Sequence, residues 1–212
     1  MRRFRIFAAV AALLISFAAV AAEAGSVGPT PQATRLVAIL RGLDVEHRWI
    51  AGHHVDWRTG LANDSTETLP GRHTHCSAFV AAAAEKLGVY ILRPPEHGQV
   101  LLANAQYEWL GTEGAARGWR PVAGPVEAQD LANQGLLVVA SYRSHRDNTP
   151  GHIAIVLPGE KTPAEIEADG PDVMQAGTVN SAAISLARGF AGHRHAWGDR
   201  EVVFYAHDAR AP

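Results

Sequence analysis

The single cysteine of the chain, Cys76, lies in the stretch GRHTHCSAFVAAAAEKLGV (71–89), where a turn gives way to an alanine-rich apolar run. Thr74 is placed to cap a helix, apolar residues recur at helical spacing, and Gly88 follows as a C-terminal cap. A helix is therefore expected over 74–87, with the thiol in its first turn. The unpaired N–H groups and the positive dipole end found there lower the pKa of a thiol and can hold an oxyanion. This position suits a nucleophile for acyl transfer, whereas a cysteine within the apolar face is typical of packing.

A thiol nucleophile needs a base, and histidine is the usual one. Among the eleven histidines, His152 is set apart by PGHIAIVLP (150–158), which places it after a Pro-Gly turn and directly before an apolar strand. An imidazole on the first residue of an interior strand can face a helix packed across the sheet, and we expect the sulfur within hydrogen-bond reach of it. For an isolated histidine, merely ending a strand is the alternative interpretation.

The secondary structure expected to position these two groups changes along the chain from helices to strands. Beside the helix at 74–87, helices are expected at 34–41 (with Thr34 as N-cap), 99–110 and 126–134. Short β-branched or aromatic runs predict strands at 136–142, 152–158, 172–179 and 201–207. Helices followed by strands, rather than alternating with them, indicate an α+β fold with an antiparallel sheet. The helix that carries Cys76 should pack across the first three strands, which should be adjacent.

The blocks HCSAFV and GHIAIV, in this order, resemble the NlpC/P60 and CHAP superfamily of papain-like cysteine peptidases and amidases. The resemblance implies a papain-like α+β fold, with N-terminal helices packed on a small antiparallel sheet. It also implies hydrolysis of peptide or amide bonds in bacterial peptidoglycan, or its stem peptides, through an acyl-enzyme. In that scheme Cys76 is the nucleophile, His152 is the general base and acid, and no cofactor is required.

The resemblance further implies a third group that orients the imidazole. In the NlpC/P60 pattern this group lies on the strand after the histidine strand, and VMQAG (173–177) occupies the matching place. Gln175 is therefore the candidate, because its side-chain oxygen can accept from a ring N–H. Asn180 and Asp172 are the alternatives, and an ordinary polar residue at a strand edge is the alternative role for Gln175 itself.

The chain departs from this pattern in two places. Many members of the superfamily carry Asp or Asn directly before the cysteine, whereas this chain has His75, and residues 34–72 have no counterpart in the pattern. Both departures bear on the substrate. We expect His75, beside the nucleophile, and Trp57, in a glycine-flanked loop, to line its binding site, although packing is the usual role of a tryptophan.

Histidine pairs offer a different chemistry. Three groups of histidines lie close together in the sequence: His53/His54, His73/His75 and His193/His195. An H-x-H pair on a strand faces one side and can share zinc or copper, but no acidic residue lies at a ligand spacing such as H-E-x-x-H. The expectation is therefore no metal. A histidine-rich metal-binding envelope protein, and a module that binds wall peptides without cutting them, stay open as alternatives.

The N-terminus predicts export. Three arginines, an apolar run and the small residues AEA (22–24) have the layout of a signal peptide over residues 1–24, so we expect a periplasmic or secreted protein without stable membrane insertion. A flexible lead-in at 25–33 and a single catalytic domain at 34–212 should follow. The formal net charge of −2, without clustered Lys or Arg, argues against a nucleic-acid partner. The oligomeric state is not determined by the sequence.

Overall fold

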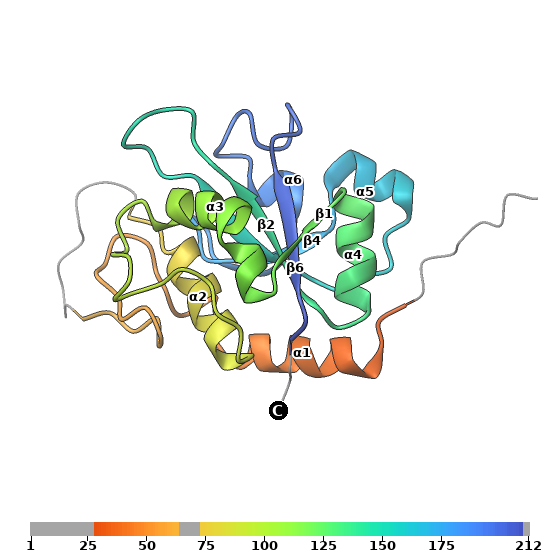
Figure 1. Cartoon of the computed structure of the whole chain (residues 1–212), viewed down its shortest axis with the longest axis horizontal. Coiled ribbons are helices and arrows are strands. Elements are labelled where there is room, and N and C mark those ends of the chain that lie inside the picture. Colours follow the sequence, from red (N-terminus) through yellow and green to blue (C-terminus); the bar gives the residue numbers. More distant parts are fainter. Residues whose placement is uncertain (1–27, 64–72, 210–212) are drawn as a thin grey trace, which may run out of the picture.

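Helices cover a central sheet in the computed structural model, which describes residues 28–63 and 73–209 (Figure 1). In these residues six strands form one antiparallel sheet in the order β1-β6-β2-β3-β4-β5. The strands are β1 (Arg120–Val122), β2 (Leu137–Tyr142), β3 (His152–Val156), β4 (Asp172–Gln175), β5 (Ser181–Ser185) and β6 (Val203–His207). The helices are α1 (Pro31–Arg41), α2 (Cys76–Lys86), α3 (Leu102–Thr112), the 3₁₀ helix η1 (Gly114–Arg117), α4 (Pro125–Asn133), α5 (Pro163–Asp169) and α6 (Leu186–Gly189).

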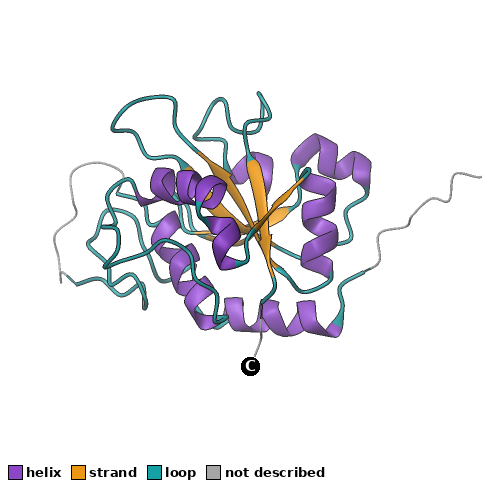
Figure 2. Ribbon diagram, in the orientation of Figure 1, coloured by secondary structure: helices purple, strands orange, loops and turns teal. Residues whose placement is uncertain are grey.

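The expected α+β class is confirmed, because N-terminal helices pack against an antiparallel sheet, an arrangement consistent with a papain-like fold (Figure 2). The predicted strands at 136–142, 152–158 and 172–179 are adjacent and antiparallel as β2, β3 and β4. The last of them is shorter than predicted, since β4 ends at Gln175. Because β4 runs antiparallel to β3, its last residue, Gln175, lies toward the end of the sheet where β3 begins.

Two hydrophobic cores lie on opposite faces of the sheet. Successive residues of a strand point to opposite faces, so Ile153 and Ile155 of β3 join one core while Ala154 and Val156 join the other. Helix α2 packs in the first core and α4 in the second. Figure 1 accordingly shows α2 and α3 on one side of the strands and α4 and α5 on the other.

Helix α2 is buried along almost its whole length, and its composition explains how. Every residue from Cys76 to Ala84 is buried, although the helix has little amphipathic character. Alanine is the best helix former and its small side chain allows close approach of the helix to the sheet. Phe79 is the exception in size, and it packs edge-on against Trp49 with ring centroids 5.3 Å apart. Helix α2, which begins with Cys76, is therefore held between the sheet and the segment that precedes it.

Several helix boundaries differ from the sequence expectation because the caps differ. Helix α1 begins at Pro31, with Thr30 accepting a hydrogen bond from the Ala33 N–H at 3.2 Å, so the predicted cap at Thr34 is wrong. Helix α2 begins at Cys76 itself, with His75 as N-cap instead of Thr74. The cysteine is thus even closer to the free N–H groups of the helix start than predicted.

Five of the described elements were not predicted: β1, β5, η1, α5 and α6. Strands β1 and β5 lie at the sheet edges, and their short sequences, RPV and SAAIS, lack the run of β-branched or aromatic residues that identifies a strand. Helix α5 begins with a capping box, in which Thr162 and Glu165 bond each other's backbone N–H groups. The Thr-x-x-Glu pattern of this box is present in the sequence and could have predicted the helix.

The expected signal peptide at 1–24 lies outside the described residues, as does part of the lead-in. Residues 31–33, also expected in the lead-in, form the first turn of α1. Within the part of the chain that the structure describes, no helix has the length and apolar character needed to cross a bilayer.

Candidate active site

Cys76 is the first residue of α2 and belongs to the core between this helix and the sheet, with 3% of its surface exposed. Burial raises the pKa of the Cys76 thiol, and backbone N–H groups of Ile153, Ser77 and Cys76 itself oppose this by hydrogen bonding to the sulfur. The expected lowering of the pKa is therefore wrong for this closed site, because desolvation of the thiolate outweighs the N–H groups that favour it. The thiol is protonated at neutral pH.

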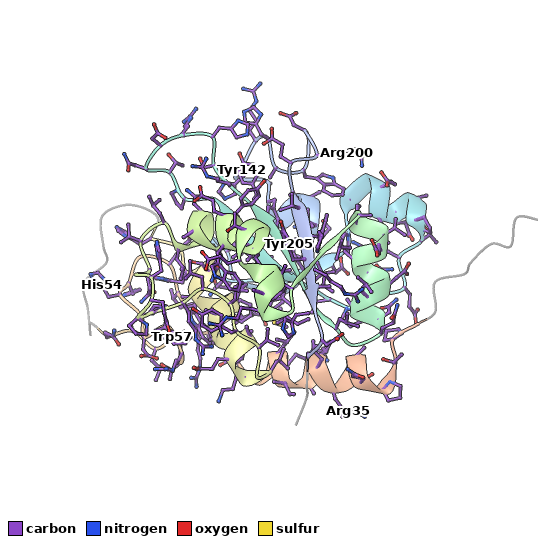
Figure 3. The ribbon with its side chains drawn as sticks, in the orientation of Figure 1. Arg35, His54, Trp57, Tyr142, Arg200 and Tyr205 are labelled. Carbon is purple, nitrogen blue, oxygen red and sulfur yellow. The ribbon has the colours of Figure 1, made fainter. Side chains whose placement is uncertain are left out.

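His152 is the first residue of β3. It pairs with Tyr142, the last residue of β2, which Figure 3 labels. It is 4% exposed, and its Nε2 lies 2.8 Å from Oε1 of Gln175. Burial lowers the pKa of His152 to about 4, although the Gln175 hydrogen bond raises it. The imidazole is therefore neutral at neutral pH and able to accept a proton.

The tautomer of this imidazole follows from the orientation of Gln175. The Gln175 Nε2 donates to the carbonyl oxygen of Val179 at 3.2 Å, so its Oε1 faces His152. An amide oxygen only accepts, and therefore the ring Nε2 carries the proton and donates it. The basic lone pair is left on Nδ1, which is the nitrogen that a general base would use.

The alternatives to Gln175 have other partners. Asn180 donates to the carbonyls of Val45 and Arg48 at 2.8 and 2.7 Å and accepts from the Gly177 N–H at 3.0 Å. Asp172, at the start of β4, pairs with Lys161 at 2.6 Å. Of the three candidates for the orienting group, the structure brings Gln175 to the imidazole.

Two glycines make room for this pair of side chains. A Cβ at Gly189 would lie 2.7 Å from Oε1 of Gln175, which is closer than real contacts allow. A Cβ at Gly177 would lie 3.5 Å from Cε1 of His152 and 3.4 Å from Nε2 of Gln175, in ordinary contact. Gly189 is therefore the position where a side chain would push the Gln175 amide away from the ring.

The thiol and the imidazole meet at the start of β3, where each has its own hydrogen-bond partners. The sulfur accepts from the N–H of Ile153, the residue that follows His152. Among the described residues, the groups that bond the sulfur are backbone N–H groups, and the bond of the imidazole is to Gln175. The close approach of Sγ to an imidazole nitrogen stays a prediction. The buried pair is thus a neutral thiol beside a neutral imidazole, with a backbone N–H holding the sulfur in place.

Two further side chains enclose the imidazole. Phe190 packs edge-on against the His152 ring with centroids 4.6 Å apart, and the ring of His193 stacks on it at 5.5 Å. The sequence patterns did not indicate either residue as part of this site. The signal was weak, because the contacts arise only when the turn after α6 folds back over β3. Both rings are thus part of the packing that buries His152.

His75 and Trp57, the expected substrate contacts, lie in different surroundings. His75 is 9% exposed, and its Nε2 is 2.9 Å from the carbonyl oxygen of His53, while burial lowers its pKa. Trp57 is 7% exposed, with the guanidinium of Arg58 lying 4.5 Å from its ring centroid. The role of both residues in substrate binding stays a prediction.

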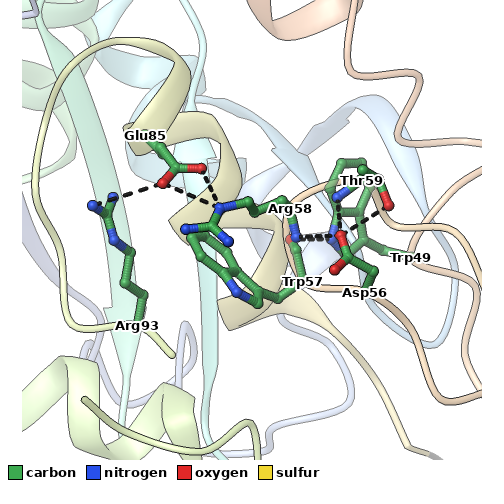
Figure 4. Close-up of polar contacts among 7 residues, drawn as sticks. All are labelled: Trp49, Asp56, Trp57, Arg58, Thr59, Glu85 and Arg93. Carbon is green, nitrogen blue, oxygen red and sulfur yellow. Dashed lines mark hydrogen bonds and ion pairs between the residues drawn. The ribbon is translucent and has the colours of Figure 1, made fainter. Parts of the chain in front are cut away.

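An ion-pair cluster connects the segment around Trp57 to helix α2 (Figure 4). Arg58 and Arg93 contact Glu85 of α2 at 3.0 and 3.8 Å, and both guanidinium groups lie over the Trp57 ring. Asp56 accepts from the N–H of Thr59 at 2.8 Å and fixes the turn between them. The long stretch before Cys76, which has no counterpart in the family pattern, is thereby attached to α2.

The histidine pairs do not assemble a metal site in the part of the chain that the structure describes, where no three His, Cys, Asp or Glu side chains converge. His195 stacks on His145 with ring centroids 5.0 Å apart, and these two rings bond the carboxylates of Asp199 and Glu201, respectively. Carboxylate partners of this kind satisfy the imidazoles without an ion.

Comparison with known proteins gives one partial similarity. No protein-family model matches the chain. Among curated proteins it is similar to "Peptidoglycan amidase Tse1" of Pseudomonas aeruginosa PAO1, with 35% identity over 85 residues. The matched segment is 40% of this chain and 46% of the relative, so the chain spans about half the length of the curated protein it matches.

Proposed function

We propose that the protein is a periplasmic or secreted cysteine hydrolase that cleaves peptide or amide bonds in bacterial peptidoglycan. The observation that carries the proposal is the buried His152–Gln175 hydrogen bond at the start of β3, beside a thiol at the N-terminus of α2. The partial similarity to a peptidoglycan amidase supports the substrate class. The catalytic domain proposed for this activity is the region from residue 34 onward.

The proposed mechanism starts from the neutral pair. As Sγ of Cys76 attacks the carbonyl carbon, its proton passes to Nδ1 of His152, and the Nε2–H bond to Gln175 holds the ring in orientation. The backbone N–H of Cys76, in the first turn of α2, donates to the developing oxyanion. The imidazolium then gives its proton to the leaving amine, which departs and leaves a thioester. Water, deprotonated by the same imidazole, hydrolyses the thioester and restores the thiol.

The direct test is digestion of purified peptidoglycan sacculi by the mature protein, followed by mass spectrometry of the released fragments. We expect fragments with new amino and carboxyl ends at one type of peptide or amide bond, and none from the Cys76→Ala variant. Sacculi that bind the protein but stay intact would contradict the proposal and favour a binding module. Cleavage that requires an added metal would favour the metal-binding alternative.

The pH dependence of this activity should respond to the charge of the third group. With the imidazole pKa near 4, the acid limb of kcat/KM should lie close to pH 4 in the wild-type protein. In Gln175→Glu a carboxylate faces the ring and favours the imidazolium, which should raise the pKa of His152 by about 1–3 units. Because the base must be neutral to act, the acid limb should move up by the same amount, and a pH profile of kcat/KM measures it.

Gln175→Met provides the matched control, since it has a similar volume, makes no hydrogen bond and adds no charge. It should reduce turnover while leaving the acid limb at or below its wild-type position, because it removes an interaction that raises the imidazole pKa. An acid limb that stays fixed in Gln175→Glu would show that His152 is not the group being titrated.

A further inference from the structure

Helix α3 contributes no reacting group, yet it contacts the chain on both sides of the proposed site. It lies beside α2 on the same face of the sheet (Figure 1). Two of its amide side chains, Asn104 and Gln106, leave the helix in different directions because they are two positions apart. Each bonds the main chain of a segment next to a proposed catalytic residue.

Asn104 bonds the loop that leads into β3. Its Oδ1 accepts from the N–H of Gly151 at 2.7 Å and from the N–H of Ser144 at 3.4 Å, while its Nδ2 donates to the carbonyl oxygen of Thr149 at 3.0 Å. One side chain therefore fixes both ends of the loop between β2 and β3. Gly151 is the residue directly before His152. The three hydrogen bonds of the Asn104 side chain, called the clasp below, therefore hold the backbone from which the imidazole projects.

The close fit around Gly151 shows how tightly this clasp holds. A side chain at Gly151 would collide with the carbonyl oxygen of Tyr142 and with Oδ1 of Asn104. Only a glycine lets the backbone approach Asn104 this closely, and the short hydrogen bond follows from that approach. The backbone before His152 thus has little freedom while Asn104 is in place.

Gln106 attaches the same helix to the nucleophile. It is fully buried, and its Nε2 donates to the carbonyl oxygen of Ser77, the residue after Cys76, at 3.2 Å and to that of Leu92 at 2.9 Å. Through Asn104 and Gln106, α3 is bonded to the neighbours of both Cys76 and His152. A rigid element bonded on both sides sets the separation of the two groups.

We propose that Asn104 is a positioning residue, which holds the backbone before His152 at a fixed distance from the helix that carries Cys76. This inference rests on the proposed function, because it assigns His152 the role of base. Displacement of reacting groups by about 1 Å can cost on the order of 100-fold in rate, so loss of the clasp should act on turnover rather than on substrate affinity.

The other end of the same strand offers a matched control. Asn133 of α4 forms an equivalent clasp on Gly159, accepting from its N–H at 2.8 Å and donating to its carbonyl oxygen at 3.0 Å. The residue type and the kind of bond are those of Asn104, but Gly159 follows β3 and is remote from His152. Asn133→Ala should therefore cost stability without affecting the position of the imidazole.

The experiment compares Asn104→Ala with Asn133→Ala in the mature protein, below the melting temperature of both. We expect kcat to fall by about 10- to 100-fold in Asn104→Ala with KM changed less than about threefold, while Asn133→Ala keeps kcat within about twofold. An NMR titration of His152, assigned by its loss in His152→Gln, gives a second readout. The His152 titration should move up by at least about one pH unit in Asn104→Ala alone, because a loosened loop admits water to the ring.

Equal losses of kcat in the two variants, or an unchanged kcat in Asn104→Ala, would overturn the inference. If Asn104→Ala fails to fold, Asn104→Asp serves instead, since it keeps an oxygen acceptor for Gly151 but replaces the donor to Thr149 with a charged oxygen. Its kcat should lie below that of Asn133→Ala. Failure of the proposed function is recognised separately, by activity that survives Cys76→Ala, and the NMR readout tests the clasp without any substrate.

Discussion

Cys76→Ala is expected to abolish peptidoglycan hydrolysis, with a loss of at least about 10⁴-fold in kcat/KM, because removal of a nucleophile removes the covalent route altogether. Cys76→Ser should be nearly as inactive. A hydroxyl is a much weaker acid than a thiol, and the neutral imidazole of His152, with a pKa of about 4, is a weak base with which to activate it. Release of soluble fragments from sacculi, followed over time, measures the loss.

The fold should survive this substitution. Cys76 is buried, but the change to alanine removes one sulfur atom and leaves the helix start and its backbone N–H groups in place. Ser77→Ala is the matched control, since it removes one buried side-chain atom from the next residue of the same helix turn. We expect it to retain activity within a few-fold. Activity that persists in Cys76→Ala would assign the thiol to packing.

The second large effect is expected for His152→Ala, which should lower kcat/KM by on the order of 10³-fold or more, because none of the proton transfers of the mechanism can then proceed efficiently. His152→Gln should be equally impaired, since an amide cannot accept the thiol proton at any accessible pH. Because the latter fills more of the space left by the ring, it separates loss of the base from loss of packing. Thermal melting of both variants shows how much of each effect comes from stability.

Among the eleven histidines, His195 offers the control for this substitution. Its ring is paired with Asp199 and stacked on His145, near the same turn but outside the buried pair. His195→Ala should keep kcat/KM within a few-fold. The reverse result, a strong loss in His195→Ala with His152→Ala still active, would move the chemistry to the histidine pairs.

Local patterns in the sequence were sufficient to predict most of the longer helices and strands and to select Cys76 and His152 as candidate site residues. The apolar run after His152 predicts β3, the alanine-rich run after Cys76 predicts α2, and the order of helices and strands predicts α+β. These features are local, since periodicity and capping depend on residues a few positions apart. The family resemblance added Gln175 as the partner of the imidazole, and the structure forms that hydrogen bond.

Edge strands such as β5 are harder to predict from local patterns in the sequence. Strand β5 is recognised by its pairing with β4 rather than by its own composition. Its residues are only partly buried, so no apolar alternation marks them. Pairing between strands is a property of two segments, and neither segment carries it alone.

The electrostatic state of the site was decided by the tertiary structure. A helix N-terminus lowers a thiol pKa in isolation, but Cys76 is also enclosed by the sheet, and its burial raises the pKa more than the N–H groups lower it. Phe190 and His193, from a turn some forty residues further along the chain, pack against the ring of His152. Asn104 of α3 bonds the backbone of Gly151, the residue before His152. Desolvation depends on everything that packs around a group, whereas helix and strand patterns depend on near neighbours. For that reason the residues could be named from the sequence, but their protonation states and the clasp that holds them required the fold.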